Sequence, residues 1–146
     1  MNDPYDLERF LTAQNDGATY PQALQELRAG SKRSHWMWFV FPQISGLGQS
    51  ATSRRYAIAS LDEAQAYLQH PVLGPRLIEC ATTVDNVDNR GAAEIFGSID
   101  ARKLQSSMTL FLRAAPEEQV FRRVLDHYFG GEADAATDRL LAGTRT

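Results

Sequence analysis

One cysteine, Cys80, is present among the 146 residues, so no disulfide can form within the chain. Long apolar stretches are missing as well: the longest, residues 36–41, is much shorter than the roughly 20 residues that a membrane-spanning helix needs. The first residues have neither the basic start nor the apolar core of a secretory signal. We therefore expect a cytoplasmic protein that has no membrane partner.

The chain also lacks an excess of positive charge and the common cofactor motifs. Its net charge of −3 argues against general nucleic-acid binding, because such binding draws its affinity from many phosphate contacts. Nucleophile elbows, Walker loops and dinucleotide fingerprints are absent, and Gly46-Leu47-Gly48 lacks the third glycine, which favours an ordinary loop. Histidines 35, 70 and 127 are scattered singly, and Cys80 has no partner at metal-ligand spacing. We expect neither a cofactor nor a metal site.

Helix signals recur along the whole sequence. Prolines stand where helices begin, and each is followed by apolar residues at helical spacing. Ser60 and Glu63 have the spacing of a capping box. These signals predict a mainly α-helical fold: a single compact domain over residues 1–146, with about six to eight helices around one core and a frayed tail at about 142–146. The expected helices cover approximately residues 4–14, 21–29, 61–69, 71–84, 100–112, 116–129 and 134–141.

The aromatic run His35–Gln43 is the exception. Its continuous hydrophobicity does not distinguish a buried strand from a buried helix. The clustered aromatic residues and the stop at Phe41-Pro42 slightly favour extended structure. Both alternatives stay open, and we expect at most a small extended element at this run.

The segment Ser31–Tyr56 has four cationic residues, no carboxylate and both tryptophans of the chain. Two indoles, each needing a fitted slot and a hydrogen-bond partner, are unusual in a plain core segment. An aromatic wall, a glycine-containing polar loop and a cationic rim predict a pocket for a planar, anionic small molecule. Whether the tryptophans face that ligand or the core stays open, and His35 is either a ligand or acid–base group or a histidine tied to a backbone carbonyl. The candidate ligand-binding residues here are Lys32, Arg33, His35, Trp36, Trp38, Gln43, Ser50, Arg54 and Tyr56.

A second polar cluster opens the helix expected after residue 100. Asp100, Lys103, Ser106 and Ser107 lie within two turns, and the free N–H groups of a helix start can bind an anion. The alternative is an N-cap aspartate paired with Lys103 and serines that face a neighbouring helix. We add Lys103 and Ser106 to the candidate ligand-binding residues.

The chain resembles the bacterial and fungal family called domain of unknown function 1810. The matching elements follow one another in order over nearly the whole chain, and the family name implies no reaction. They include Gly30-Ser31-Lys32, Ser34-His35-Trp36-Met37-Trp38-Phe39, Phe41-Pro42-Gln43, Gly46-Leu47-Gly48, His70-Pro71, Phe96-Gly97 and the stretch from Asp100 to Phe111.

A fainter similarity is to the NADAR superfamily of YbiA-like proteins, which are associated with cleavage of N-glycosidic bonds in ribosyl phosphates and ADP-ribose adducts. Residues 8–14 resemble their early Glu-aromatic-x-x-Ala-Gln helix, and His70-Pro71-Val72-Leu73 resembles their His-Pro-x-Leu helix. Phe96 stands where those proteins have tryptophan, and their lysine-asparagine element is absent. This resemblance implies Asp100, Glu94 and Glu8 as candidate catalytic carboxylates.

Two functions are therefore open. One is an N-glycosidase-like hydrolase that acts on a nucleotide-like, ADP-ribosyl or ribosyl-phosphate substrate, in which a carboxylate stabilises the oxocarbenium character of the sugar. The other is a binding module without chemistry, for a nucleotide or an acidic partner. A pocket with two carboxylates near Trp36 or Trp38 would favour the hydrolase, and an open groove without such a pair would favour the binding module.

Overall fold

A long central helix organises the fold. In the computed structural model, which describes residues 3–144, α8 (Ser98–Ala114) packs against α5 (Leu61–Gln69), α7 (Ala92–Phe96), α9 (Gln119–Phe129) and α10 (Ala135–Thr144). All seven residues from Ser106 to Leu112 are buried, so this part of α8 is covered on every side. The core of the molecule is therefore built around α8.

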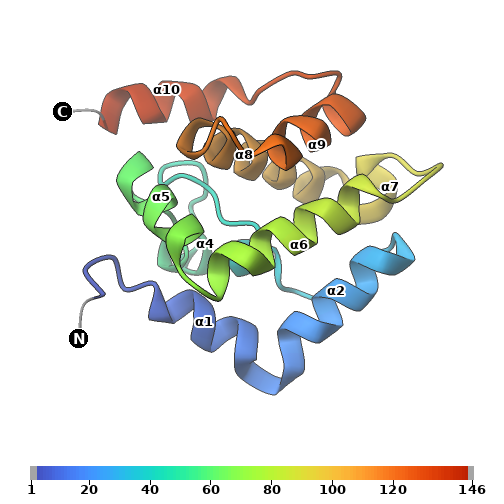
Figure 1. Cartoon of the computed structure of the whole chain (residues 1–146), viewed down its shortest axis with the longest axis horizontal. Helices are drawn as coiled ribbons and strands as arrows, with labels where there is room; N and C mark the ends of the chain where they lie inside the picture. Colours follow the sequence, from blue (N-terminus) through green and yellow to red (C-terminus); the bar gives the residue numbers. More distant parts are fainter. Residues whose placement is uncertain (1–2, 145–146) are drawn as a thin grey trace.

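The other helices lie below α8 in the view of Figure 1. Helix α6 (Leu73–Asp85) packs against α5 and α9, and against α2 (Thr19–Ala29), which pairs with α1 (Glu8–Asn15). Short helical turns complete the set: a 3₁₀ turn at Asp16–Ala18, α3 (Met37–Val40) and α4 (Ala51–Arg55). Residues 3–144 contain no β-strand, only an isolated parallel bridge between Ile44 and Ile58. The mainly α-helical single domain predicted from the sequence is confirmed, and the seven helices of eight or more residues in the described part of the chain match the expected six to eight.

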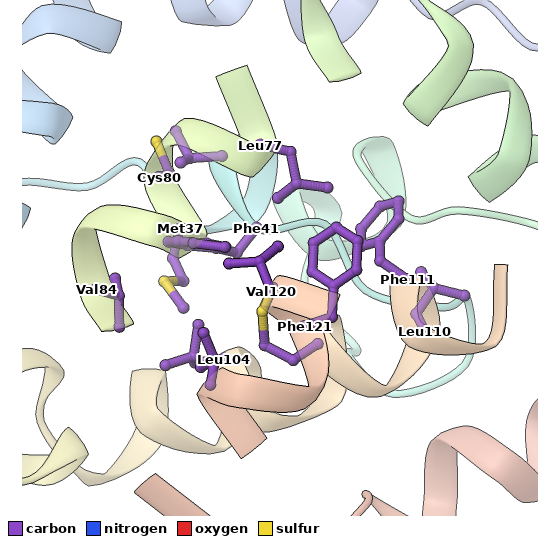
Figure 2. Close-up of a cluster of buried hydrophobic side chains, with 14 of the residues drawn as sticks. Met37, Phe41, Leu77, Cys80, Val84, Leu104, Leu110, Phe111, Val120 and Phe121 are labelled. Atoms are coloured by element: carbon purple, nitrogen blue, oxygen red, sulfur yellow. The ribbon is translucent and has the colours of Figure 1, made fainter. Parts of the chain in front are cut away.

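Side chains from the aromatic run, α6, α8 and α9 meet in one apolar core. Figure 2 shows Met37 and Phe41 beneath Leu77 of α6, with Leu104 and Phe111 of α8 nearby. These five side chains are at most 1% exposed. Burying such large groups is the main favourable term for folding, at roughly 1.5–3 kcal/mol per side chain.

Local signals start or stop several helices at the residues where the sequence predicts these boundaries. Gly30 stops α2 in the left-handed region with φ 69°, and Gly130 stops α9 with φ 62°. Ser60 caps α5 by accepting from the Glu63 N–H. Asp100 differs from its prediction: Gly97 is the N-cap of α8, so Asp100 lies in the first turn and not at the cap.

The aromatic run is neither a strand nor a full helix. Residues 37–40 form the single turn α3, and the chain then leaves helical geometry at Phe41 before Pro42. The small extended element falls just after the run, where the Ile58 N–H donates to the Gln43 carbonyl at 2.8 Å and the Ser45 N–H donates to the Ile58 carbonyl at 2.8 Å. This bridge holds the polar loop 45–57 closed at its base.

The start of α1 and the end of α10 lie at the same side of the molecule in Figure 1. Helix α1 begins at Glu8, four residues after Pro4, and the Asp3 carboxylate accepts from the Leu7 and Glu8 N–H groups. Helix α10 extends to Thr144, so residues 142–144 of the expected frayed tail are helical and 145–146 lie outside the described residues. Among the described helices, none combines the length and the apolar character that a membrane crossing requires.

Candidate functional site

The two tryptophans have different surroundings. Trp36 is completely buried in the core, and its indole N–H donates to Glu26 at 2.9 Å. Trp38 is half-buried, and its indole N–H has no hydrogen-bond partner within residues 3–144. The Lys103 ammonium lies 4.9 Å from the centre of the Trp38 ring, in cation–π range. Trp36 therefore belongs to the core, which answers for this residue the question that the sequence left open, and Trp38 is the partly exposed indole.

Glu26 anchors the start of the basic segment. This α2 carboxylate is 4% exposed, and both of its oxygens accept hydrogen bonds. Burial alone raises the pKa of the carboxyl, but the hydrogen bonds that it accepts outweigh burial and lower its pKa from 4.5 to about 2. The donors are the Arg33 and Ser34 backbone N–H groups, the Ser34 hydroxyl, the Gln22 amide and the Trp36 indole.

Asp100 lies between two lysines. Its Oδ2 is 2.9 Å from the Lys32 Nζ, and its Oδ1 is 3.4 Å from the Lys103 Nζ. The Lys32 ammonium also lies 5.2 Å from the centre of the Trp36 ring. All three charged side chains are mostly covered, with at most 21% of their surface exposed. Two ammonium groups and one carboxylate leave this cluster with a net positive charge.

Beside this cluster an open groove runs along α8, which we call the α8 groove. It has a volume of about 490 Å³, within the range of small-molecule sites. Lys103 and Arg102 supply cations to it, and the Gln43 amide donates to the Ser106 hydroxyl at 3.0 Å in its wall. The remaining lining residues are Leu47, Gly48, Ser53, Ile99, Gln105, Asp134 and Ala136.

A smaller hollow adjoins the groove and shares Gln43, Gly48 and Ser53 with it. Its volume of about 20 Å³ leaves space for a water molecule and not for a ring. Trp38, Arg54 and Tyr56 line it. Six of the predicted ligand-binding residues therefore surround the two adjoining hollows: Trp38, Gln43, Arg54, Tyr56, Lys103 and Ser106.

The other predicted ligand-binding residues lie elsewhere or have structural contacts. Lys32 contacts Asp100 and the buried Trp36, as described above. The side chains of Arg33 and His35 are exposed, and neither residue lines either hollow. Ser50 is the N-cap of α4, where its hydroxyl accepts from the Ser53 N–H at 3.1 Å.

The three predicted catalytic carboxylates are not brought together. Glu94 is exposed on α7, and its Oε1 accepts from the Gly91 N–H at 2.8 Å. Glu8 is exposed on α1 beside Thr12. Asp100 alone joins the lysine cluster, and neither hollow is lined by any of the three.

Comparison with known proteins places the chain in a family. The family model described as "Protein of unknown function (DUF1810)" matches residues 4–141. The chain belongs to this family. Its fold matches the crystal structure, at 1.38 Å, of the conserved hypothetical protein Rv1873 from Mycobacterium tuberculosis, with a TM-score of 0.93 and 56% sequence identity. That match covers 96% of this chain and 99% of the other. No curated protein matches.

Several residues of the site were missed by sequence reasoning. Arg102 lines the groove, and its side chain has no ion-pair or hydrogen-bond partner among the described residues. Glu26 could have been noticed, because it follows Ala23 by one helical turn on the buried side of α2. Asp134, just before α10, lines the groove, and Thr137 of α10 contacts Ser106 in its wall. No local spacing predicts these contacts.

The structure also locates the cysteine and two of the histidines. Cys80 is completely buried, and this burial raises the pKa of its thiol to about 12, as for a small core residue. His127 lies on the exposed side of α9 beside Asp85, and the His70 ring nitrogen accepts from backbone N–H groups at the start of α6. Within residues 3–144, no three His, Cys, Asp or Glu side chains are grouped so that they could hold a metal ion.

Proposed function

We propose that this protein binds a small anionic ligand, of the size and charge of a nucleoside monophosphate, in the α8 groove. The observation that carries the proposal is the unpaired Arg102 guanidinium beside Lys103 in the wall of this groove. A cation without a protein partner, next to hydroxyl and amide groups, offers charge-assisted hydrogen bonds to a phosphate.

The local charge supports the same ligand class. The chain as a whole has a net charge of −3, yet Arg54, Arg102 and Lys103 gather at the two hollows. Asp134 is the one carboxylate among the groove-lining residues, and its Oδ2 already accepts two hydrogen bonds from Thr137. A positive region on an acidic protein attracts anions and raises their rate of association.

Hydrolysis is less well supported than binding. The N-glycosidase hypothesis, which came from the resemblance to the NADAR superfamily, requires a carboxylate that faces a cationic sugar in the transition state. The Asp100 oxygens instead face the Lys32 and Lys103 ammonium groups, and Glu94 and Glu8 lie away from the groove. We therefore propose the binding module, with N-glycosidase activity as the alternative to be tested.

The binding test compares nucleotides with nucleosides by isothermal titration. UMP and AMP should bind, and uridine and adenosine should bind at least tenfold more weakly, because the phosphate supplies the charge-assisted contacts. Equal binding of nucleotide and nucleoside, or no binding of either nucleotide, would overturn the proposal.

Two pairs of variants locate the site. Arg102→Gln should weaken UMP binding by about tenfold, whereas Arg28→Gln, on the exposed side of α2, should leave it unchanged. Arg54→Ala should weaken binding more than Arg55→Ala, because Arg54 lines the smaller hollow and Arg55 lines neither. The melting temperatures should change little, since exposed charges contribute little to stability. Similar affinities for the two members of each pair would place the ligand elsewhere.

A turnover assay tests the alternative. We expect no hydrolysis of ribosyl-phosphate or ADP-ribosyl substrates by the wild-type protein, by Asp100→Asn or by Glu94→Gln. Hydrolysis by the wild type that falls at least tenfold in Asp100→Asn would establish the N-glycosidase instead.

A further inference from the structure

Four polar side chains connect α10 to the wall of the α8 groove. The Gln43 Nε2 lies 3.0 Å from the Ser106 Oγ, and the Ser106 Oγ lies 3.3 Å from the Thr137 Oγ1. The Thr137 Oγ1 lies 2.6 Å from the Asp134 Oδ2. Thr137 is completely buried and Ser106 is 2% exposed, so no solvent competes for these inner hydrogen bonds.

The carboxylate at one end sets the direction of every hydrogen bond in this chain. A carboxylate only accepts, so the single hydroxyl proton of Thr137 is donated to Asp134. The Thr137 oxygen must then accept the hydroxyl proton of Ser106. Because Ser106 donates its only hydroxyl proton to Thr137, its oxygen accepts from Gln43. This hydrogen bond orients the Gln43 NH₂ group toward Ser106.

The amide oxygen of Gln43 therefore takes no part in this chain of hydrogen bonds. Gln43 lines both the α8 groove and the smaller hollow, and its Oε1 has no hydrogen-bond partner within residues 3–144. We infer that Gln43 determines specificity by presenting a fixed acceptor, so that the preferred anionic ligand carries an N–H or O–H donor at this position. This inference rests on the proposed binding function and adds the hydrogen-bonding chemistry of the ligand.

Thr137 contacts the groove-lining residues Ser106 and Asp134, which makes it a positioning residue. It does not line the α8 groove. Thr137→Val keeps the volume but removes the hydroxyl, so Ser106 loses its acceptor and can donate to Gln43 instead. The Gln43 amide can then turn its NH₂ group away from Ser106. Thr137→Ser keeps the hydroxyl and serves as the matched control.

The test uses pairs of nucleotides that differ in one donor. UMP carries the N3–H that 3-methyl-UMP lacks, and AMP carries the N6 amino protons that N6,N6-dimethyl-AMP lacks. In at least one pair, the wild type and Thr137→Ser should bind the donor-bearing nucleotide about tenfold more tightly, because covering the Gln43 acceptor with a ligand that offers it no donor is costly. In Thr137→Val this ratio should fall to within about twofold, with the affinity for the methylated nucleotide retained.

Failure of the inference and failure of the proposed function give different results. If nucleotides bind better than nucleosides but the wild type binds both members of each pair equally, the specificity inference is wrong and the binding function stands. If no nucleotide binds, both are wrong. A ratio that stays tenfold in Thr137→Val would show that another group provides the discrimination.

A measurement without ligand checks the orientation of the amide itself. In nuclear magnetic resonance spectra, one side-chain N–H proton of Gln43 should show the downfield shift and slow exchange of a hydrogen-bonded proton in the wild type and in Thr137→Ser. Both features should be lost in Thr137→Val. Identical Gln43 side-chain signals in all three proteins would overturn the fixed orientation even if nucleotides bind.

Discussion

Replacing Glu26 by glutamine removes the charge that holds the start of the basic segment. The carboxylate is 4% exposed and accepts hydrogen bonds from the loop that leads to Trp36. Its pKa is lowered from 4.5 to about 2 in the folded protein. Because one pKa unit corresponds to about 1.4 kcal/mol, the ionised carboxylate contributes about 3 kcal/mol to folding. A loss of that size is a large share of the roughly 5–15 kcal/mol that stabilises a typical protein.

The sign of the pH dependence follows from the lowered pKa. The contribution of Glu26 is fully present above its unfolded pKa of 4.5 and is lost as the pH falls toward about 2. We therefore expect Glu26→Gln to cost about 3 kcal/mol at pH 6 and close to nothing at pH 2, where the wild-type carboxyl is itself half or more protonated.

Urea unfolding at a series of pH values from 2 to 6 measures this difference. Other carboxylates titrate in the same range, but they are common to both proteins, so the difference between wild type and Glu26→Gln isolates Glu26. Glu117→Gln, at an exposed position, is the control and should follow the wild type at every pH. Parallel curves for wild type and Glu26→Gln would refute the reasoning, because they would mean that the folded protein does not lower the pKa of this carboxyl.

Three further predictions concern the packing around α8 and α6. Ser107 is completely buried and its hydroxyl has no hydrogen-bond partner within the described residues, so Ser107→Ala should raise the free energy of unfolding by about 1 kcal/mol. Ser106→Ala should lower it by about 1 kcal/mol, since it breaks the contacts with Gln43 and Thr137. Urea unfolding at pH 7 measures the free energy of unfolding of both variants. A destabilised Ser107→Ala would contradict the first expectation. Gly74→Ala should lower the free energy of unfolding by about 1–3 kcal/mol or prevent folding, because a Cβ there would overlap the Leu68 carbonyl oxygen. An unchanged melting temperature would contradict this expectation.

The sequence by itself determined the helices, because their signals are local. The capping of α5 by Ser60, the stop of α2 at Gly30 and the termination of α9 at Gly130 each depend on residues within one turn of the chain. The Asp100–Lys103 ion pair is also local, since residues three apart lie on the same side of a helix.

Only the tertiary structure decided which of these residues meet. Lys32 joins Asp100 because α7 and the loop after α2 pack together, as the hydrogen bond from the Lys32 N–H to the Ile95 carbonyl shows. Trp36 and Trp38 are two residues apart, yet one is in the core and the other at a hollow. Their roles were undecidable from sequence because the single helical turn α3 gives neighbouring residues different directions.

The α8 groove also depends on long-range contacts. Gln43, Ser106 and Thr137 come from three segments that are 63 and 31 residues apart. Packing of α10 and of the segment after α3 against α8 brings them into one hydrogen-bonded chain. Helix spacing fixes which side chains share a face within a segment. The choice of which faces meet is made by burial of apolar surface across the whole domain, and the positions of the polar groups in the groove follow from that choice.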